Sequence, residues 1–284
     1  MTVCIAALCN DDHLVAVFDR MITVGGISEY EPRLSKATAL PTHNIFILVA
    51  GDMSFHEEVL AELRPTVMPT ETDINSLNVV EVARLYKELA NRIYLEREQE
   101  PILRRYKLTP ETFISRQSEM SHAFIDRVMD ELDKIDPPPV SALILGYDQR
   151  KRAQIFRFSN GRLTLETATG FAAIGNGEWH AETQLHDCGF TKGCLLVDGL
   201  FYCYASKKRA ELAPGVGTQT RIIYINREGY HNLDPFSERD LETIFRQLQR
   251  ELLEIDVKIS KEWRERFNSN QQEAAKIRVE IIEE

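Results

Sequence analysis

The chain has 284 residues, of which 43% are hydrophobic, so it can bury a substantial core in one large domain or two small ones. Its formal net charge of −10 disfavours nonspecific binding to nucleic acid, which generally requires a basic surface. No stretch approaches the run of roughly 20 apolar residues that spans a bilayer. No basic segment precedes the N-terminal apolar run, so we expect a cytosolic protein without a membrane partner.

The N-terminal part of the chain is predicted to form β-strands. Residues 2–8 are apolar and partly β-branched, and the Asn-Asp-Asp sequence at 10–12 is typical of a turn. Two more apolar runs, 13–18 and 45–50, have the length of strands. Because these runs are apolar at nearly every position, they predict sheets that are buried on both faces.

Helical periodicity follows the third strand. Apolar residues recur at three- and four-residue spacing from 79 to 93, behind a capping-box pattern at 78–81. A Thr-Pro pair then opens a second predicted helix, 109–135, with proline at the first helical position. The prolines at 137–139 end this helix.

Strands return after the prolines, and two further helices and a last strand follow them. The predicted strands are 140–145, 153–158, 163–167, 171–174 and 220–226, the helices lie near 178–185 and 192–212, and a long amphipathic helix opens at Ser237. A Ser-Asn-Gly sequence at 159–161 predicts a hairpin turn. This order predicts an α+β protein with layered sheets and helices outside, not a doubly wound fold.

The cysteine and histidine pattern predicts neither a disulfide framework nor a metal centre. The five cysteines are an odd number without CxxC spacing. His180, His186 and Cys188 lack a fourth ligand at a convincing spacing. The Gly-Asn-Gly sequence at 175–177 is too short for a dinucleotide-binding loop, so we expect no cofactor.

Thr2 has the chemistry of an N-terminal nucleophile once Met1 is removed. A threonine hydroxyl needs a base, and a free α-amine on the same residue titrates at about pH 8, close to working pH. A nearby ammonium keeps that amine neutral, a carboxylate holds the ammonium, and a backbone N–H at a strand end stabilises the oxyanion. Lys36, Asp19 and Gly51 are suited to these three roles.

These residues belong to a pattern that resembles the N-terminal signature of proteasome β-subunits and the bacterial HslV peptidase. The pattern reads Thr2…Asp19-Arg20-Met21-Ile22-Thr23…Ser35-Lys36…Val49-Ala50-Gly51-Asp52. The Ile-Gly-Asn-Gly sequence at 174–177 and the late strand and turn at 221–229 also resemble this family. The resemblance covers residues 2–60 and 140–235.

The resemblance implies a four-layer αββα sandwich of the Ntn-hydrolase type, within the α+β class. It assigns residues 1–235 to the Ntn-hydrolase domain, with a helical insertion at 98–139. Residues 236–284 then form a C-terminal helical extension.

The resemblance also assigns catalytic roles. Thr2 is the nucleophile and, through its amine, the base; Lys36 tunes the amine and Asp19 holds Lys36. The N–H of Gly51 lines the oxyanion hole. Asn176 replaces the serine of the family's Gly-Ser-Gly turn, and an amide can donate and accept hydrogen bonds but cannot relay a proton as a hydroxyl does.

The same resemblance also implies which residues contact the substrate. Thr23 binds the substrate backbone, and Ile22, Val49 and Met53 line the first specificity pocket, whose apolar walls favour apolar groups. The loop at 213–218 lacks the Asp and Ser that the family places there; Glu211 and Thr218 are the nearest replacements.

Three functions are compatible with this pattern. The first is a threonine peptidase that acts on peptides or unfolded chains, as a homo-oligomeric ring or helical assembly that could work with an ATPase partner. The second is an amidase that uses the same Thr–amine pair on small amides. The third is a noncatalytic assembly or binding subunit, which is favoured by Asn176 and the altered loop and opposed by Thr2, Asp19 and Lys36.

Overall fold

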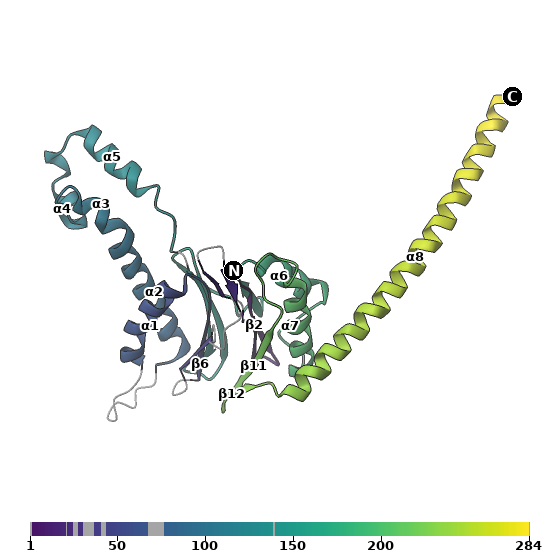
Figure 1. The fold of residues 1–284 in the computed structure, drawn as a ribbon, viewed down its shortest axis with the longest axis horizontal. Helices are drawn as coiled ribbons and strands as arrows, with labels where there is room; N and C mark the ends of the chain where they lie inside the picture. The colour runs from purple at the N-terminus through teal and green to yellow at the C-terminus, as the bar shows by residue number, and fades with distance from the viewer. Residues whose placement is uncertain are drawn as a thin grey trace. The chain divides into compact units, whose positions relative to one another are not determined.

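The structure is a computed structural model, and it describes residues 2–20, 22–24, 28–30, 37–40, 44–67, 77–138 and 140–283. The chain divides into two compact units, Met1–Leu233 and Asp234–Glu284. The first unit contains the sheets, and the second is a single helix, α8 (Pro235–Glu283) (Figure 1). None of the described helices is long and apolar enough to cross a membrane.

The first sheet is built around the N-terminal hairpin. Its five antiparallel strands have the order β10-β1-β2-β11-β12. Their bounds are Phe171–Ile174 (β10), Cys4–Cys9 (β1), His13–Asp19 (β2), Thr220–Asn226 (β11) and Gly229–Asn232 (β12). Asn10 and Asp11 link β1 to β2 with φ values of 53° and 55°, a left-handed conformation that Asn and Asp tolerate better than most residues. This tight turn returns the chain so that the start of β1 faces the end of β2.

The second sheet also has five antiparallel strands, in the order β5-β6-β7-β8-β9. Their bounds are Ala37–Leu40 (β5), Ile45–Gly51 (β6), Val140–Tyr147 (β7), Ala153–Ser159 (β8) and Arg162–Leu165 (β9). The predicted hairpin turn is confirmed between β8 and β9, where Asn160 and Gly161 both have positive φ. A separate pair joins β3 (Ile22–Val24) to β4 (Ser28–Tyr30).

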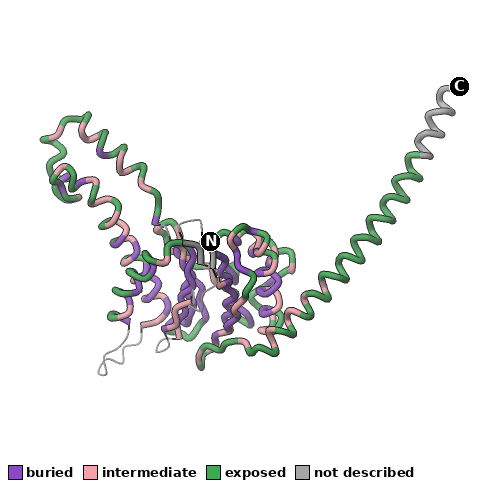
Figure 2. The backbone as a smooth tube through the Cα atoms, in the orientation of Figure 1, coloured by how far each residue is buried: buried purple, intermediate pink, exposed green. Residues whose placement is uncertain are grey.

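One apolar cluster receives side chains from both five-stranded sheets. It includes Cys4 and Phe18 of the first sheet and Leu48 and Leu143 of the second. Alternate residues of β6, such as Ile47, point into a different cluster on the opposite face of their sheet. Both faces of β6 are therefore buried, which explains why its sequence is apolar at nearly every position (Figure 2).

Helices pack against both sheets. The cluster on the outer face of the second sheet includes α1 (Met53–Val67) and α2 (Val79–Tyr94), while α6 (Glu178–Asp187) and α7 (Leu196–Ala210) contact strands of the first sheet. The predicted capping box is confirmed, since Asn78 forms it with Glu81 at the start of α2. At the start of α1, Asp52 accepts hydrogen bonds from the first turn.

The segment between α2 and β7 forms several short helices instead of the single helix predicted for 109–135. These are η2 (Leu95–Gln99), α3 (Glu100–Arg104), α4 (Pro110–Ser115), η3 (Gln117–Glu119) and α5 (His122–Leu132). The break comes where Met120 and Ser121 adopt extended backbone, so Ser121 begins a new helix. This break allows Phe113 and Val128 to share a small core with Leu103 and Leu108. The predicted apolar residues Phe113 and Val128 are indeed buried, and the residues that they pack against belong to the same segment of short helices.

The predicted fold class was too specific and is corrected by the structure. The described residues form an α+β fold of two antiparallel five-stranded sheets and helices, and a four-layer αββα Ntn sandwich is not confirmed. Sequence periodicity identifies strands and helices and hence the α+β class. It does not specify how elements stack, because the packing depends on contacts between segments distant in sequence.

Candidate active site at the N-terminal hairpin

The site is formed where the start of β1 meets the end of β2. Thr2 precedes β1 and is buried, with 3% of its surface exposed. Its hydroxyl donates a hydrogen bond to Oδ1 of Asp19, the last residue of β2. The antiparallel register pairs Cys4 with Phe18, so the neighbouring residues of both strands necessarily come together. The structure thus brings Thr2 and Asp19 together, and their catalytic roles stay predictions.

Asp19 is a completely buried carboxylate that accepts hydrogen bonds on both of its oxygens. Besides the hydroxyl of Thr2, Oδ1 accepts the backbone N–H of Val3 at 3.1 Å. The other oxygen, Oδ2, accepts the N–H of Gly217 at 2.9 Å. A buried carboxylate is costly unless it is hydrogen-bonded, and backbone donors supply that compensation with fixed geometry. The arrangement therefore fixes both oxygens, one of them against the threonine hydroxyl.

The turn at 175–177 packs against the backbone of Thr2. Gly177 donates its N–H to the Thr2 carbonyl at 3.3 Å. Gly175 has a φ of 94°, and a Cβ at this position would lie 2.4 Å from the same carbonyl oxygen. The turn thus requires glycine both for its backbone conformation and for this close approach. Asn176 is exposed, and the catalytic role that was assigned to it stays a prediction.

The end of β6 lies beside the start of β1. The thiol of Cys4 is 3.5 Å from the carbonyl oxygen of Val49. Gly51, which ends β6, has a φ of 105°. The Val49 side chain is buried in the cluster beneath α1 and α2, and Met53 packs against that same cluster. The roles of these residues in the oxyanion hole and specificity pocket stay predictions.

Two other predicted site residues are placed by their strand, and a third lies outside the described residues. Ile22 and Thr23 are in β3, which pairs with β4. Lys36, predicted to tune the amine, lies outside the described residues.

A buried lysine that the sequence analysis did not identify contacts the loop that donates a hydrogen bond to Asp19. Lys207 is in the last turn of α7 and is fully buried. Its Nζ pairs with Glu211 and donates to the carbonyl oxygens of Gly217 and Thr218 at 2.8 and 2.9 Å. Burial lowers the pKa of Lys207, while the carboxylates of Glu211 and Asp19 oppose that shift. The available sequence signal was a Lys-x-x-x-Glu spacing in an otherwise apolar helix.

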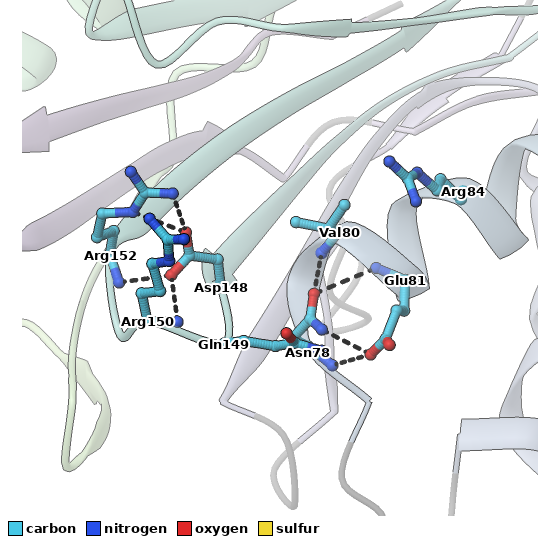
Figure 3. A pocket seen from close by; sticks show the side chains of 8 residues that line it. All are labelled: Asn78, Val80, Glu81, Arg84, Asp148, Gln149, Arg150 and Arg152. Carbon is cyan, nitrogen blue, oxygen red and sulfur yellow. Dashed lines mark hydrogen bonds and ion pairs between the residues drawn. The ribbon is translucent and has the colours of Figure 1, made fainter.

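A surface cavity lies away from this site, between the start of α2 and the turn joining β7 to β8. Figure 3 shows its polar walls. Asp148 accepts hydrogen bonds from the side chain and backbone of Arg152 and from the Arg150 backbone, and the Asn78–Glu81 capping box forms the opposite side. These hydrogen bonds explain the polar side chains of the cavity as parts of a turn and of a helix cap. A second cavity is lined by residues including Arg157 and Glu166 and is likewise separate from Thr2.

Comparison with known proteins gives a fold and no family. No family model matches the chain, and no curated protein matches it. An Anbu mutant from Hyphomicrobium sp. strain MC1 superposes with a TM-score of 0.59 at 13% identity, covering 89% of this chain and 96% of that chain. Anbu from Yersinia bercovieri, described as an ancestral beta-subunit, superposes with a TM-score of 0.61 at 12% identity, covering 89% and 95%.

These findings correct the predicted membership of the proteasome β-subunit and HslV family. The solved structures reported above are Anbu proteins, and identities of 12–13% support a likeness of fold alone. The motif residues alone do not establish membership, because no family model matches the chain. The chain has the fold of Anbu proteins.

Proposed function

We propose that the protein is a threonine peptidase whose nucleophile is the hydroxyl of Thr2 after removal of Met1. The observation that carries this proposal is the hydrogen bond from the Thr2 hydroxyl to the buried carboxylate of Asp19. The carboxylate is itself held by the backbone of Val3 and Gly217. A hydroxyl fixed by a rigid acceptor at the start of the chain is suited to directed attack.

The hydroxyl and the amine of one residue supply both the nucleophile and the base. The free α-amine of Thr2 takes the proton from Oγ1 while Oγ1 forms a bond to the peptide carbonyl carbon. The C–N bond of the substrate then breaks, and the amine returns the proton to the leaving nitrogen. Water hydrolyses the resulting ester and restores the threonine. In this scheme Asp19 orients Oγ1, Lys36 keeps the amine neutral, and the Gly51 N–H stabilises the oxyanion.

The proposed substrates are peptides or unfolded protein segments. Ile22, Val49 and Met53 would favour apolar side chains next to the cleaved bond. A homo-oligomeric assembly, with an ATPase that delivers substrate, is part of the same proposal. The neighbour described as an ancestral beta-subunit supports assembly from repeated copies.

The experiment is intact-mass analysis of the purified protein before and after treatment with a β-lactone or epoxyketone probe. We expect loss of Met1 and one covalent adduct, mapped to Thr2. Thr2→Ala should give no adduct, whereas Thr2→Ser should retain it, because serine keeps the hydroxyl. An adduct that persists in Thr2→Ala would show that another residue reacts and would overturn the proposal.

A noncatalytic assembly subunit is the second candidate. It is favoured by the exposed Asn176 residue and by the loop before β11, where Asp19 accepts a hydrogen bond from the backbone N–H of Gly217. Retained Met1 together with absence of an adduct would support this candidate. If an adduct forms at Thr2, turnover of peptides against small amides separates a peptidase from an amidase.

A further inference from the structure

Lys207 has a complete set of hydrogen-bond partners. A lysine ammonium has three N–H donors and no acceptor. The structure supplies three acceptors, namely the Glu211 carboxylate and the carbonyl oxygens of Gly217 and Thr218. A neutral amine would leave one of these acceptors facing its lone pair, so the geometry fits the charged form. The charge is kept in a fully buried position by these contacts.

Gly217 lies between this ammonium and the candidate active site. Its carbonyl oxygen accepts from Lys207 at 2.8 Å, and its N–H donates to Oδ2 of Asp19 at 2.9 Å. The other Asp19 oxygen accepts the Thr2 hydroxyl. A continuous series of contacts therefore runs from Glu211 through Lys207, Gly217 and Asp19 to Thr2. The glycine has no side chain with which to fix its own position.

We infer that Lys207 is a positioning residue, which holds the loop at 217–218 so that the Gly217 N–H fixes the Asp19 carboxylate toward the Thr2 hydroxyl. The inference rests on the proposed function of Thr2 as nucleophile. Lys207 does not touch Oγ1 and acts through the backbone. Loss of the ammonium frees the loop, the carboxylate loses a donor, and the hydroxyl loses its fixed orientation.

Lys208 provides a matched control on the same helix. It pairs with the same Glu211 carboxylate at 2.9 Å, but its ammonium lies over the ring of Tyr204, 5.6 Å from the centroid. Lys207→Met and Lys208→Met therefore each remove one positive charge, at adjacent positions. Lys207→Met in addition removes the hydrogen bonds to the carbonyl oxygens of the loop at 217–218. Glu211→Gln is a milder third variant, since it keeps a carbonyl oxygen for Lys207 while removing the charge.

The test measures the rate of Thr2 labelling by the β-lactone probe against probe concentration and pH. We expect Lys207→Met to lower the maximal labelling rate on the order of 100-fold. A mutation distant from the reacting atoms can misplace them and lower the reaction rate by a factor of this size. The half-saturating probe concentration should change by less than about two-fold, since binding of the probe is not altered. Glu211→Gln should fall between the two, and Lys208→Met should label at the wild-type rate. Thermal unfolding of each variant identifies any that fail to fold.

Amide hydrogen exchange of the 213–219 segment gives a readout that does not depend on activity. We expect exchange at Gly217 to be faster by roughly ten-fold or more in Lys207→Met and unchanged in Lys208→Met. Folded Lys207→Met with wild-type labelling overturns the inference, and so does unchanged exchange. If the wild type itself is not labelled, the proposed function fails, and exchange alone decides whether Lys207 fixes this loop. If Lys207→Met does not fold, the same two readouts are taken from Glu211→Gln.

Discussion

The side chain of His56 shows how burial controls a titratable group in this protein. His56 lies in α1 with 1% of its surface exposed, and its Nδ1 is 2.9 Å from the Tyr86 hydroxyl. Among the described residues, its Nε2 has no hydrogen-bond partner. Burial, with a smaller contribution from Arg64, lowers the pKa of His56 from 6.5 to about 4. The folded protein therefore keeps this imidazole neutral at pH values where the unfolded chain binds a proton.

The free energy of unfolding should consequently fall on acidification. Between pH 6.5 and 4 the unfolded state binds more protons at His56 than the folded state, so stability rises with pH in this window. The contribution is complete above pH 6.5, and about 3 kcal/mol of it is lost by the time pH reaches 4. Urea unfolding across this range measures the slope.

His56→Gln is the control, because glutamine does not titrate and can still form a hydrogen bond with Tyr86. The variant should lose the part of the pH dependence that belongs to His56. Equal slopes for wild type and variant would show that other groups cause the acid sensitivity.

The candidate site was predictable from the sequence only where its residues lie on one hairpin. Thr2 and Asp19 are joined by two apolar strands and a turn, so their approach follows from strand register. Lys207 was missed because two adjacent lysines near a helix end are usually a solvated pair. Its role depends on the fold of a loop ten residues further on, and local periodicity contains no information about that packing.

At the level of elements, the turn at 175–177 positions the start of β1, and Gly175 is its most constrained residue. Gly175→Ala should lower the free energy of unfolding by about 3 kcal/mol. About 1 kcal/mol comes from the left-handed backbone and the remainder from displacing the Thr2 carbonyl. Gly189→Ala is the matched control, since Gly189 also has positive φ but has no atom within 4 Å of the added Cβ, and it should cost only about 1 kcal/mol. Chemical denaturation of both variants checks the difference, and equal losses would rule out the steric contribution.

The long apolar strands were predicted close to their observed bounds, whereas the short strands β3, β4, β5 and β12 were not predicted. Runs such as 45–50 are apolar throughout because both faces of the sheet are covered, and the structure gives β6 at nearly the same residues. The helix predicted over 109–135 was interrupted at Ser121, although its apolar residues do form a core. Hydrophobic periodicity indicates which residues are buried, but it does not indicate whether the chain turns between them.

At the scale of the whole molecule, the two compact units differ in how their apolar residues are buried. The Met1–Leu233 unit contains both sheets and the cluster between them. In α8, large side chains such as Leu253, Val257 and Trp263 are mostly exposed. The described apolar clusters of the first unit are formed by that unit's own side chains.

A chain ending at Leu233 should fold. We expect its melting temperature to lie within about 4 °C of the full-length value, which corresponds to about 1 kcal/mol for a domain of this size. Circular dichroism with thermal melting provides the measurement, and native mass spectrometry of both chains shows whether α8 is needed for oligomers. A truncated chain that does not fold would contradict the independence of the two units.

The contact between Gly217 and Asp19 also has a consequence for the order in which the protein is made. Thr2 and Asp19 leave the ribosome early and can pair within the N-terminal hairpin, but the Gly217 N–H can reach the Asp19 carboxylate only after residue 217 has been synthesised. A nascent chain that stalls before this point carries the threonine without the finished carboxylate support. The complete support of this carboxylate therefore requires a chain that has been translated at least through Gly217.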